Sequence, residues 1–122
     1  EFYSSAVLLR ADDADSRQGL TAPHDCRAML PLDLLRGRRL AYNSLDSMSG
    51  ILALERDLDA IGESLDIFSD RLETGGHRAS VVAVAEGRAD VCAIDCRSWA
   101  MARRFEPAAG KLVPVGWTAR RK

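Results

Sequence analysis

The chain has 122 residues, 47% of them hydrophobic, which is enough for one domain with a buried core and too few for two ordinary domains. Its 17 basic and 18 acidic residues give a net charge of -1, so it lacks the positive excess of a nucleic-acid-binding protein. The longest apolar runs fall far short of the roughly 20 residues that cross a bilayer, which argues against a membrane-spanning helix.

The first third of the chain predicts a strand, a loop and a second strand. Residues 3–10 (YSSAVLLR) are apolar and β-branched enough for a buried strand. Residues 14–33 hold two prolines and no sustained period, which predicts a loop with at most one short helical turn. Residues 38–43 (RRLAYN) form the second predicted strand.

An amphipathic helix is predicted to follow from Ser49. Gly62 stands where a left-handed C-terminal stop is expected. The helix has one buried face, because its apolar residues keep helical spacing: Ile51, Leu54, Leu58 and Ile61.

The next segments predict a strand, a helix and a second strand. Residues 65–70 (LDIFSD) are a short strand candidate, and the Gly75-Gly76 pair marks a turn. Residues 78–87 (RASVVAVAEG) predict a helix that ends at Gly87. The almost fully apolar residues 91–94 (VCAI) predict a strand covered on both faces, which ends at Asp95.

The last segments predict a third helix over residues 96–105 and a final strand over 111–117. Three large side chains of that helix are expected in the core: Trp99, Met101 and Phe105. Pro114 indicates that the final strand lies at an edge or is irregular, because proline cannot donate to a sheet ladder.

The three cysteines are scattered and show no CxxC motif or histidine at metal-ligand spacing. Cys92 is expected to pack in the core as a small apolar side chain. Cys26 and Cys96 are expected to be free thiols or a pair.

Strands that alternate with helices predict a three-layer α/β/α sandwich with a mostly parallel sheet of about five strands. Ligands of such sheets sit beyond the carboxyl ends of the strands. Three polar segments follow successive predicted strands: 43–50 (NSLDSMSG), 74–80 (TGGHRAS) and 95–98 (DCRS). They hold no catalytic triad, metal-ligand spacing or nucleotide phosphate loop. The pattern therefore predicts a binding site without chemistry, metal or cofactor.

Four blocks of the chain, in this order, resemble the phosphate/phosphonate-binding components of ABC transporters: YSSAVLLRADD, DLLRGRRLAYNSLDSMSG, GGHRASVVAVAEGRADVCAID and LVPVGWT. The similarity covers almost the whole chain. It implies the type 2 periplasmic-binding-protein fold, in which two strands cross a hinge between two lobes. Residues 1–122 would form the second lobe alone, with hinge-crossing strands near 3–10 and 112–117.

In that family, the turn that matches DSMSG binds the phosphoryl group. Carried over residue by residue, the resemblance nominates the hydroxyls of Ser47 and Ser49 and the backbone N–H groups of Met48, Ser49 and Gly50. Unpaired N–H groups and the positive end of a helix dipole favour an anion at this place. The alternative is that Ser47 or Asp46 only caps the helix.

The segment that matches GGHRAS is the second binding element. His77 can donate to the anion or serve as a helix cap or surface residue. The family has an acidic residue after this histidine, whereas this chain has Arg78, which would repel a ligand amine and favour a doubly anionic ligand. Asp95 matches a family position that contacts the polar or cationic end of the ligand, or else it caps the next helix. Tyr3 matches a tyrosine near the hinge that can line the cleft.

The resemblance implies a solute-binding lobe of an ABC-type importer that recognises a small oxyanion such as a phosphonate, phosphate or phosphite. An ABC permease would be its partner and the periplasm its location, although no leader sequence opens the chain. The alternative is a ligand-sensing domain of the same fold from a signalling receptor or transcription regulator. An enzyme ranks third, because no nucleophile and base pair is visible. Exposed hinge strands, around Tyr3 or around Val113, can pair between chains, so a homodimer is one possible assembly.

Overall fold

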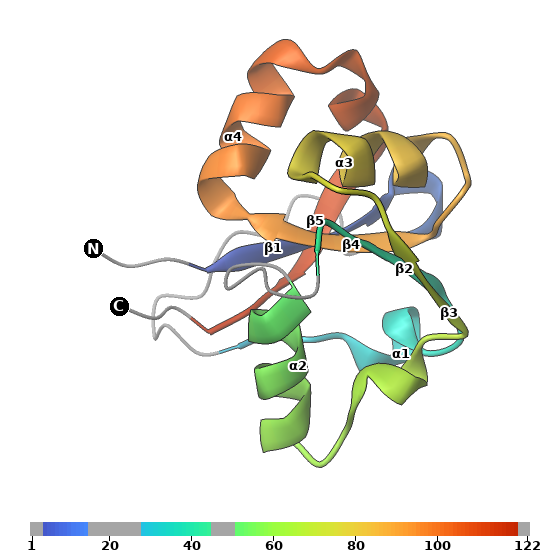
Figure 1. Ribbon diagram of the computed structural model, residues 1–122, viewed down its shortest axis with the longest axis vertical. Coiled ribbons are helices and arrows are strands. Elements are labelled where there is room, and N and C mark those ends of the chain that lie inside the picture. The colour runs from blue at the N-terminus through green and yellow to red at the C-terminus, as the bar shows by residue number, and fades with distance from the viewer. Residues whose placement is uncertain (1–3, 15–27, 45–50, 120–122) are drawn as a thin grey trace.

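The computed structural model describes residues 4–14, 28–44 and 51–119, which form a five-stranded sheet with helices on both faces (Figure 1). The strands are β1 (Ser5–Arg10), β2 (Arg39–Tyr42), β3 (Asp70–Glu73), β4 (Val91–Asp95) and β5 (Leu112–Trp117). The α-helices are α1 (Leu32–Leu35), α2 (Ile51–Ala60), α3 (His77–Ala85) and α4 (Cys96–Phe105). Short 3-10 helices are η1 (Ala11–Asp13), η3 (Leu65–Ile67) and η4 (Pro107–Lys111).

The strand order across the sheet is β3-β2-β4-β1-β5. Strand β2 runs parallel to both β3 and β4, whereas β1 runs antiparallel to both β4 and β5. Four strands therefore share one direction, as expected for a mostly parallel sheet, and β1 runs against them. Because Ser5 pairs with Asp95 and Ala6 with Trp117, the start of β1 lies at the same sheet edge as the ends of β4 and β5.

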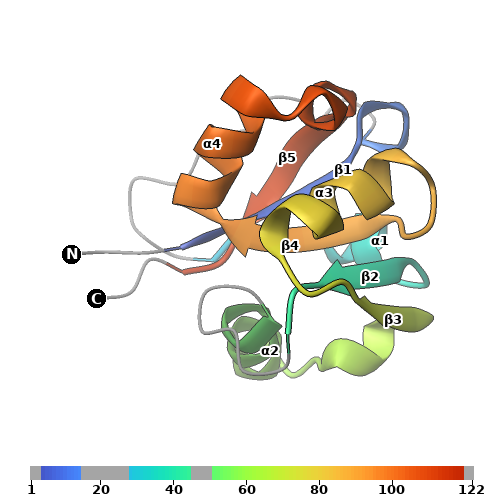
Figure 2. The same cartoon turned by 45° about the horizontal axis from the view of Figure 1, so that its top comes forward.

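Alternate side chains of β1 enter two separate cores, one on each face of the sheet. One core joins β1 to α1, α2 and η3 and includes Val7, Leu9, Leu54 and Leu58. The other joins β1 to α3 and α4 and includes Ala6, Leu8, Val81 and Trp99. Burying each large apolar side chain contributes about 1.5–3 kcal/mol. The predicted three-layer sandwich is confirmed, with α3 and α4 on one side of the sheet and α2 on the other (Figure 2).

The third strand lies further along the chain than predicted. Residues Leu65–Ile67 form the 3-10 helix η3, and Leu65 and Phe68 pack into the core beside α2. The strand itself is Asp70–Glu73, and all four of its side chains are exposed. This edge strand is held by backbone hydrogen bonds to one neighbouring strand, and it buries no side chain. Its sequence therefore lacks the apolar periodicity that predicts a strand.

Helix α2 buries Ile51, Leu54 and Leu58, as its spacing predicts. Ile61 was predicted on the same buried face, but its side chain is 53% exposed. The prediction was wrong because α2 ends at Ala60, so the helical period no longer applies to Ile61. Gly62 has a φ of +79°, which is the predicted left-handed stop.

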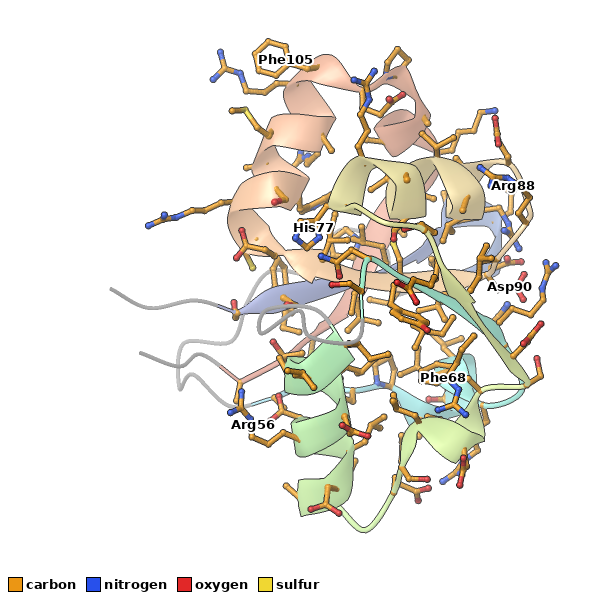
Figure 3. The ribbon with its side chains drawn as sticks, viewed as in Figure 1. Arg56, Phe68, His77, Arg88, Asp90 and Phe105 are labelled. Carbon is orange, nitrogen blue, oxygen red and sulfur yellow. The ribbon has the colours of Figure 1, made fainter. Side chains whose placement is uncertain are left out.

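Helix α4 contributes one large side chain to the core rather than three. Trp99 is buried, as predicted, but Met101 is 59% exposed and Phe105 67% exposed. Residues six apart differ by about 120° around a helix axis, so Trp99 and Phe105 cannot both face the sheet. Figure 3 shows Phe105 at the outer end of α4.

Strand β5 is an edge strand of the sheet, as Pro114 indicates. Its register against β1 shifts between Val7 and Leu8, and Leu8 lies opposite Pro114. Beyond β5, Met29 exchanges two backbone hydrogen bonds of 2.8 Å with Trp117. This segment passes so close that a Cβ on Gly116 would lie 2.4 Å from the carbonyl oxygen of Met29.

Cys92 is fully buried, which confirms its expected core role, and burial raises the pKa of its thiol to about 12. The Sγ atom of Cys96 lies 3.1 Å from Oγ of Ser4. Cys92 and Cys96 form no disulfide with each other, and Cys26 lies outside the described residues. Within the described ranges, no helix has the length and apolar character needed to cross a membrane.

Candidate functional site

The loops that follow β2 and β3 lie side by side at the carboxyl edge of the sheet. The backbone N–H of Thr74 donates to the carbonyl of Tyr42 at 2.8 Å, and that of Gly75 donates to the carbonyl of Asn43 at 2.9 Å. These bonds continue the parallel pairing of β2 and β3 past the ends of the strands. Two of the three predicted site segments therefore meet, as the strand order requires.

Thr74 fixes the turn that leads into α3. Its Oγ1 lies 3.1 Å from the carbonyl oxygen of Tyr42, 3.0 Å from that of Gly76 and 2.6 Å from the hydroxyl of the fully buried Ser80. Gly75 has a φ of +91°, a region that favours glycine. The start of α3 is therefore held rigidly at the sheet edge.

His77 is the first residue of α3, and its Nδ1 atom is buried without a hydrogen-bond partner among the described residues. The residue before it, Gly76, is the N-cap and supplies no side-chain cap. Burial lowers the pKa of His77, and the negative charge of Asp95 acts in the opposite direction. Figure 3 shows His77 beside the point where β4 passes into α4. A neutral imidazole with an unused ring nitrogen therefore stands where the two segments meet.

Asp95 caps helix α4. Its Oδ2 accepts hydrogen bonds from the backbone N–H groups of Arg97 and Ser98, at 3.1 and 3.2 Å. Of the two roles predicted for Asp95, the structure thus shows the cap. The carboxylate remains close enough to His77 to influence its charge.

Arg78 is bonded to Glu106 at the far end of α4, with 2.7 Å between Nε and Oε1. Its side chain is 78% exposed, and Glu106 also accepts a hydrogen bond from the backbone N–H of Ala108. These bonds lower the pKa of Glu106 and keep it ionised. The pair borders a groove of about 330 Å³ between α3 and α4, next to Met101 and Phe105. The guanidinium thus points along α4 rather than at the end of β4.

Five of the eight predicted site residues lie outside the described residues: Tyr3, Ser47, Met48, Ser49 and Gly50. Helix α2, which is predicted to begin within that turn, is described from Ile51 onward. Of the other three, the structure brings His77 and Asp95 together and directs Arg78 to Glu106.

Asn43 and Thr74 lie in two of the predicted site segments, but the sequence nominated neither of them as a site residue. The Oδ1 atom of Asn43 is buried and lacks a hydrogen-bond partner among the described residues, which costs about 1–3 kcal/mol. An asparagine that follows a strand resembles an ordinary turn residue, so its sequence context carried no signal. In the part of the chain that is described, no cluster of three or more His, Cys, Asp or Glu residues could hold a metal ion.

A family model described as "ABC transporter, phosphonate, periplasmic substrate-binding protein" matches residues 1–120. The search of curated proteins found no match. Among solved structures, PhnD1 from Prochlorococcus marinus in complex with methylphosphonate has a TM-score of 0.70 and 21% identity; the alignment covers 96% of this chain and 44% of PhnD1.

Two further structures share the fold. A binding protein component of an ABC phosphonate transporter from Pseudomonas aeruginosa has a TM-score of 0.68 and 18% identity over 97% of this chain and 39% of its own. XAC2383 from Xanthomonas citri, bound to chloride ion, has a TM-score of 0.69 and 20% identity over 98% of this chain and 42% of its own. The chain thus spans less than half the length of each structure.

Proposed function

Because the chain belongs to the family of periplasmic substrate-binding proteins of phosphonate ABC transporters, we propose that it binds a small phosphoryl oxyanion at the carboxyl edge of its sheet. The family consists of transport proteins, not enzymes. The observation that carries the proposal is that the buried Nδ1 of His77 has no hydrogen-bond partner among the described residues. His77 lies at the start of α3, where no side chain caps the helix. A ligand oxygen there would satisfy the ring nitrogen and would benefit from the positive end of the helix dipole.

The second half of the proposed site is the turn before α2. The hydroxyls of Ser47 and Ser49 and the N–H groups of Met48, Ser49 and Gly50 would donate to the same anion. Each hydrogen bond to a charged group contributes about 1.5–3 kcal/mol. Helix α2 lies on the opposite face of the sheet from α3, so the ligand would sit between two helix starts (Figure 2).

The remaining nominated residues would surround this anion. Asp95 would orient the ligand end that is polar or cationic while it continues to cap α4. Tyr3 would line the cleft near the hinge. Arg78 would add positive charge at the start of α3, and its guanidinium would leave Glu106 to reach the ligand.

We propose that the chain is one lobe of a two-lobed protein. Strand β1 begins and strand β5 ends side by side at the edge that carries the site (Figure 1). A chain that crossed there to a second lobe would place the ligand between the lobes, where both can desolvate it. The fraction of the related structures that the chain spans, 44% for PhnD1, supports this arrangement. The two-lobed protein would deliver its ligand to an ABC permease from the periplasm.

The experiment that tests the proposal compares methylphosphonate affinities in the two-lobed protein by titration calorimetry. Loss of two hydrogen bonds to a charged ligand should make binding by the double variant Ser47→Ala, Ser49→Ala about 2–4 kcal/mol weaker. Ser69→Ala is the matched control. Ser69 is exposed and directly precedes β3, at the opposite end of that strand from the proposed site. An unchanged dissociation constant in the double variant would limit the DSMSG turn to helix capping.

A further inference from the structure

The groove of about 330 Å³ between α3 and α4 is mainly apolar on the side of α4. Of the four large apolar side chains that are exposed in the described part of the chain, two line this groove: Met101, 59% exposed, and Phe105, 67% exposed. Concave, mostly apolar sites with a few polar groups are typical of small-molecule binding, and about 300 Å³ is the lower end of their usual range. The groove therefore has the size and lining of a site for a small apolar group.

An ion pair crosses the groove beside Phe105. Arg78, near the start of α3, bonds through Nε to Oε1 of Glu106 at 2.7 Å. Because Glu106 directly follows α4, this bond joins the two helices at that end of the groove. Glu106 is the only acidic side chain among the described residues that line the groove, and Arg78 compensates its charge. The groove can thus accept a ligand that carries negative charge.

The other end of the groove reaches the proposed anion site. His77 belongs to both, because it lines the groove and its buried Nδ1 is the group proposed to meet a ligand oxygen. Figure 3 shows His77 beside the start of α4 and Phe105 at the outer end of that helix. Ser98 and Phe105 both line the groove and lie about 10 Å apart along the helix axis. A ligand group that extends from His77 along α4 would therefore contact Met101 and then Phe105.

We propose that the groove binds the apolar substituent of an organic phosphonate whose phosphoryl group lies at His77. The ligands of this chain would then include phosphonates with an alkyl or aryl group larger than methyl. This inference rests on the proposed function, because it needs a phosphoryl group at His77. Contact with Met101 and Phe105 would remove apolar ligand surface from water, which is favourable.

A second copy of the chain fits the groove less well. The guanidinium carbon of Arg104 lies 5.3 Å from the centre of the Phe105 ring. A symmetric contact between two copies would bring these two cations together at the interface, where like charges repel each other. An apolar group that is attached to an anion meets no such repulsion.

The test is an NMR titration of the chain, labelled with ¹⁵N and with ¹³C in its methionine methyl groups. Methylphosphonate should shift the backbone amide of His77 and leave the Met101 methyl unchanged, because its organic group is too short to reach along the groove. Hexylphosphonate should shift both signals with one saturation curve and bind at least about tenfold more tightly, because its longer alkyl chain leaves water. The methyl of Met29 is the internal control, since the backbone of Met29 pairs with Trp117 and the residue does not line the groove.

Phe105→Ala tests the groove without disturbing the core, because Phe105 is exposed. The variant should bind methylphosphonate as the wild type does, while its preference for hexylphosphonate should fall at least about threefold, because less apolar surface contacts the alkyl chain. Ile61→Ala is the matched control. Ile61 is also a large, exposed apolar residue, but it follows α2 on the opposite face of the sheet.

The outcomes separate the inference from the proposed function. If the two phosphonates bind equally tightly, or if Phe105→Ala keeps the full preference for hexylphosphonate, the inference is overturned and anion binding stands. If neither phosphonate shifts the His77 amide, both are overturned. If hexylphosphonate shifts only the Met101 methyl, the groove binds apolar chains apart from the anion site, which also overturns the inference. A Met101 shift that grows with protein concentration alone would assign the groove to a second copy of the chain and would overturn it as well.

Discussion

Asp90 accepts hydrogen bonds from both the backbone and the side chain of Arg39, with its Oδ2 3.0 Å from the backbone nitrogen and 2.9 Å from Nε. Its Oδ1 also lies 2.8 Å from a guanidinium nitrogen of Arg10. Figure 3 shows Asp90 at the opposite end of the sheet from His77. The pair therefore anchors the starts of β2 and β4, away from the candidate site.

Replacing Asp90 by Asn should lower the free energy of unfolding by about 2 kcal/mol at neutral pH, because several hydrogen bonds to a charged acceptor are weakened. The hydrogen bond from Arg39 is the main cause of the strongly lowered pKa of Asp90. The Asp90 carboxylate contributes fully to folding stability above pH 3.8, the pKa of an aspartate in the unfolded chain. This contribution is lost as the pH falls through the lower pKa of Asp90 in the folded chain. Urea denaturation should show a smaller difference in the free energy of unfolding between wild type and variant below pH 3.8 than near neutral pH. A constant difference would contradict this account, and Asp66→Asn, at an exposed position, serves as the control.

Gly116→Ala should destabilise the fold through a steric clash with the segment beside β5. The added Cβ would lie 2.4 Å from the carbonyl oxygen of Met29 and 2.8 Å from Cδ of Pro31. Overpacking of this kind costs about 1–3 kcal/mol. Gly110→Ala is the matched control, because a Cβ there meets nothing within 4 Å. Equal midpoints of thermal unfolding for the two variants would show that the Met29 segment moves to accommodate the added Cβ, and would contradict this prediction.

The pattern of the sequence predicted the layers of this fold better than its long-range pairings. Helix α2, strand β4 and the stop at Gly62 follow from spacing and from glycine chemistry, which are local properties. The reversed direction of β1 depends on which strands it joins, and neighbouring residues do not encode that choice.

The placement of the candidate site residues in the fold was predicted only in part. The position of His77 followed from the strand order and the family motif, whereas two contacts had no sequence signal. Arg78 bonds to Glu106 and Asp57 to Ala119 across 28 and 62 residues, and only the folded chain brings such pairs together.

The imidazole of His77 should titrate with a midpoint below 6.5 in the ligand-free chain, because burial is the main cause of its lowered pKa. Because the folded chain favours the neutral ring, protonation of His77 opposes folding. The neutral ring contributes fully to folding stability above pH 6.5, and this contribution is lost as the pH falls through the pKa of His77 in the folded chain. Saturating methylphosphonate should raise the midpoint, since a nearby anion favours the charged ring. NMR titration of the His77 ring protons with and without ligand measures both values. A ligand that leaves the midpoint unchanged would place the anion away from His77.

Arg78→Gln in the two-lobed protein should narrow the preference for methylphosphonate over aminoethylphosphonate, because a charge that repels the ligand amine is removed. Competitive titration calorimetry of the two ligands gives the ratio of dissociation constants. Arg88→Gln is the control, since Arg88 carries the same charge and is also exposed and paired with a glutamate, but follows the far end of α3. If Arg78→Gln and Arg88→Gln change the ratio by the same amount, Arg78 serves only its ion pair with Glu106.

The central claim is that the carboxyl edge of the sheet binds a phosphoryl anion through His77. Titration calorimetry of methylphosphonate against the two-lobed protein and its His77→Ala variant, at one ionic strength set with chloride, tests it most directly. Loss of one hydrogen bond to a charged ligand should weaken binding by about 1.5–3 kcal/mol, or roughly 10- to 150-fold. Saturable binding that weakens by this amount in His77→Ala is the predicted result. Equal affinity in the two proteins, or no binding of methylphosphonate by either, would contradict the account.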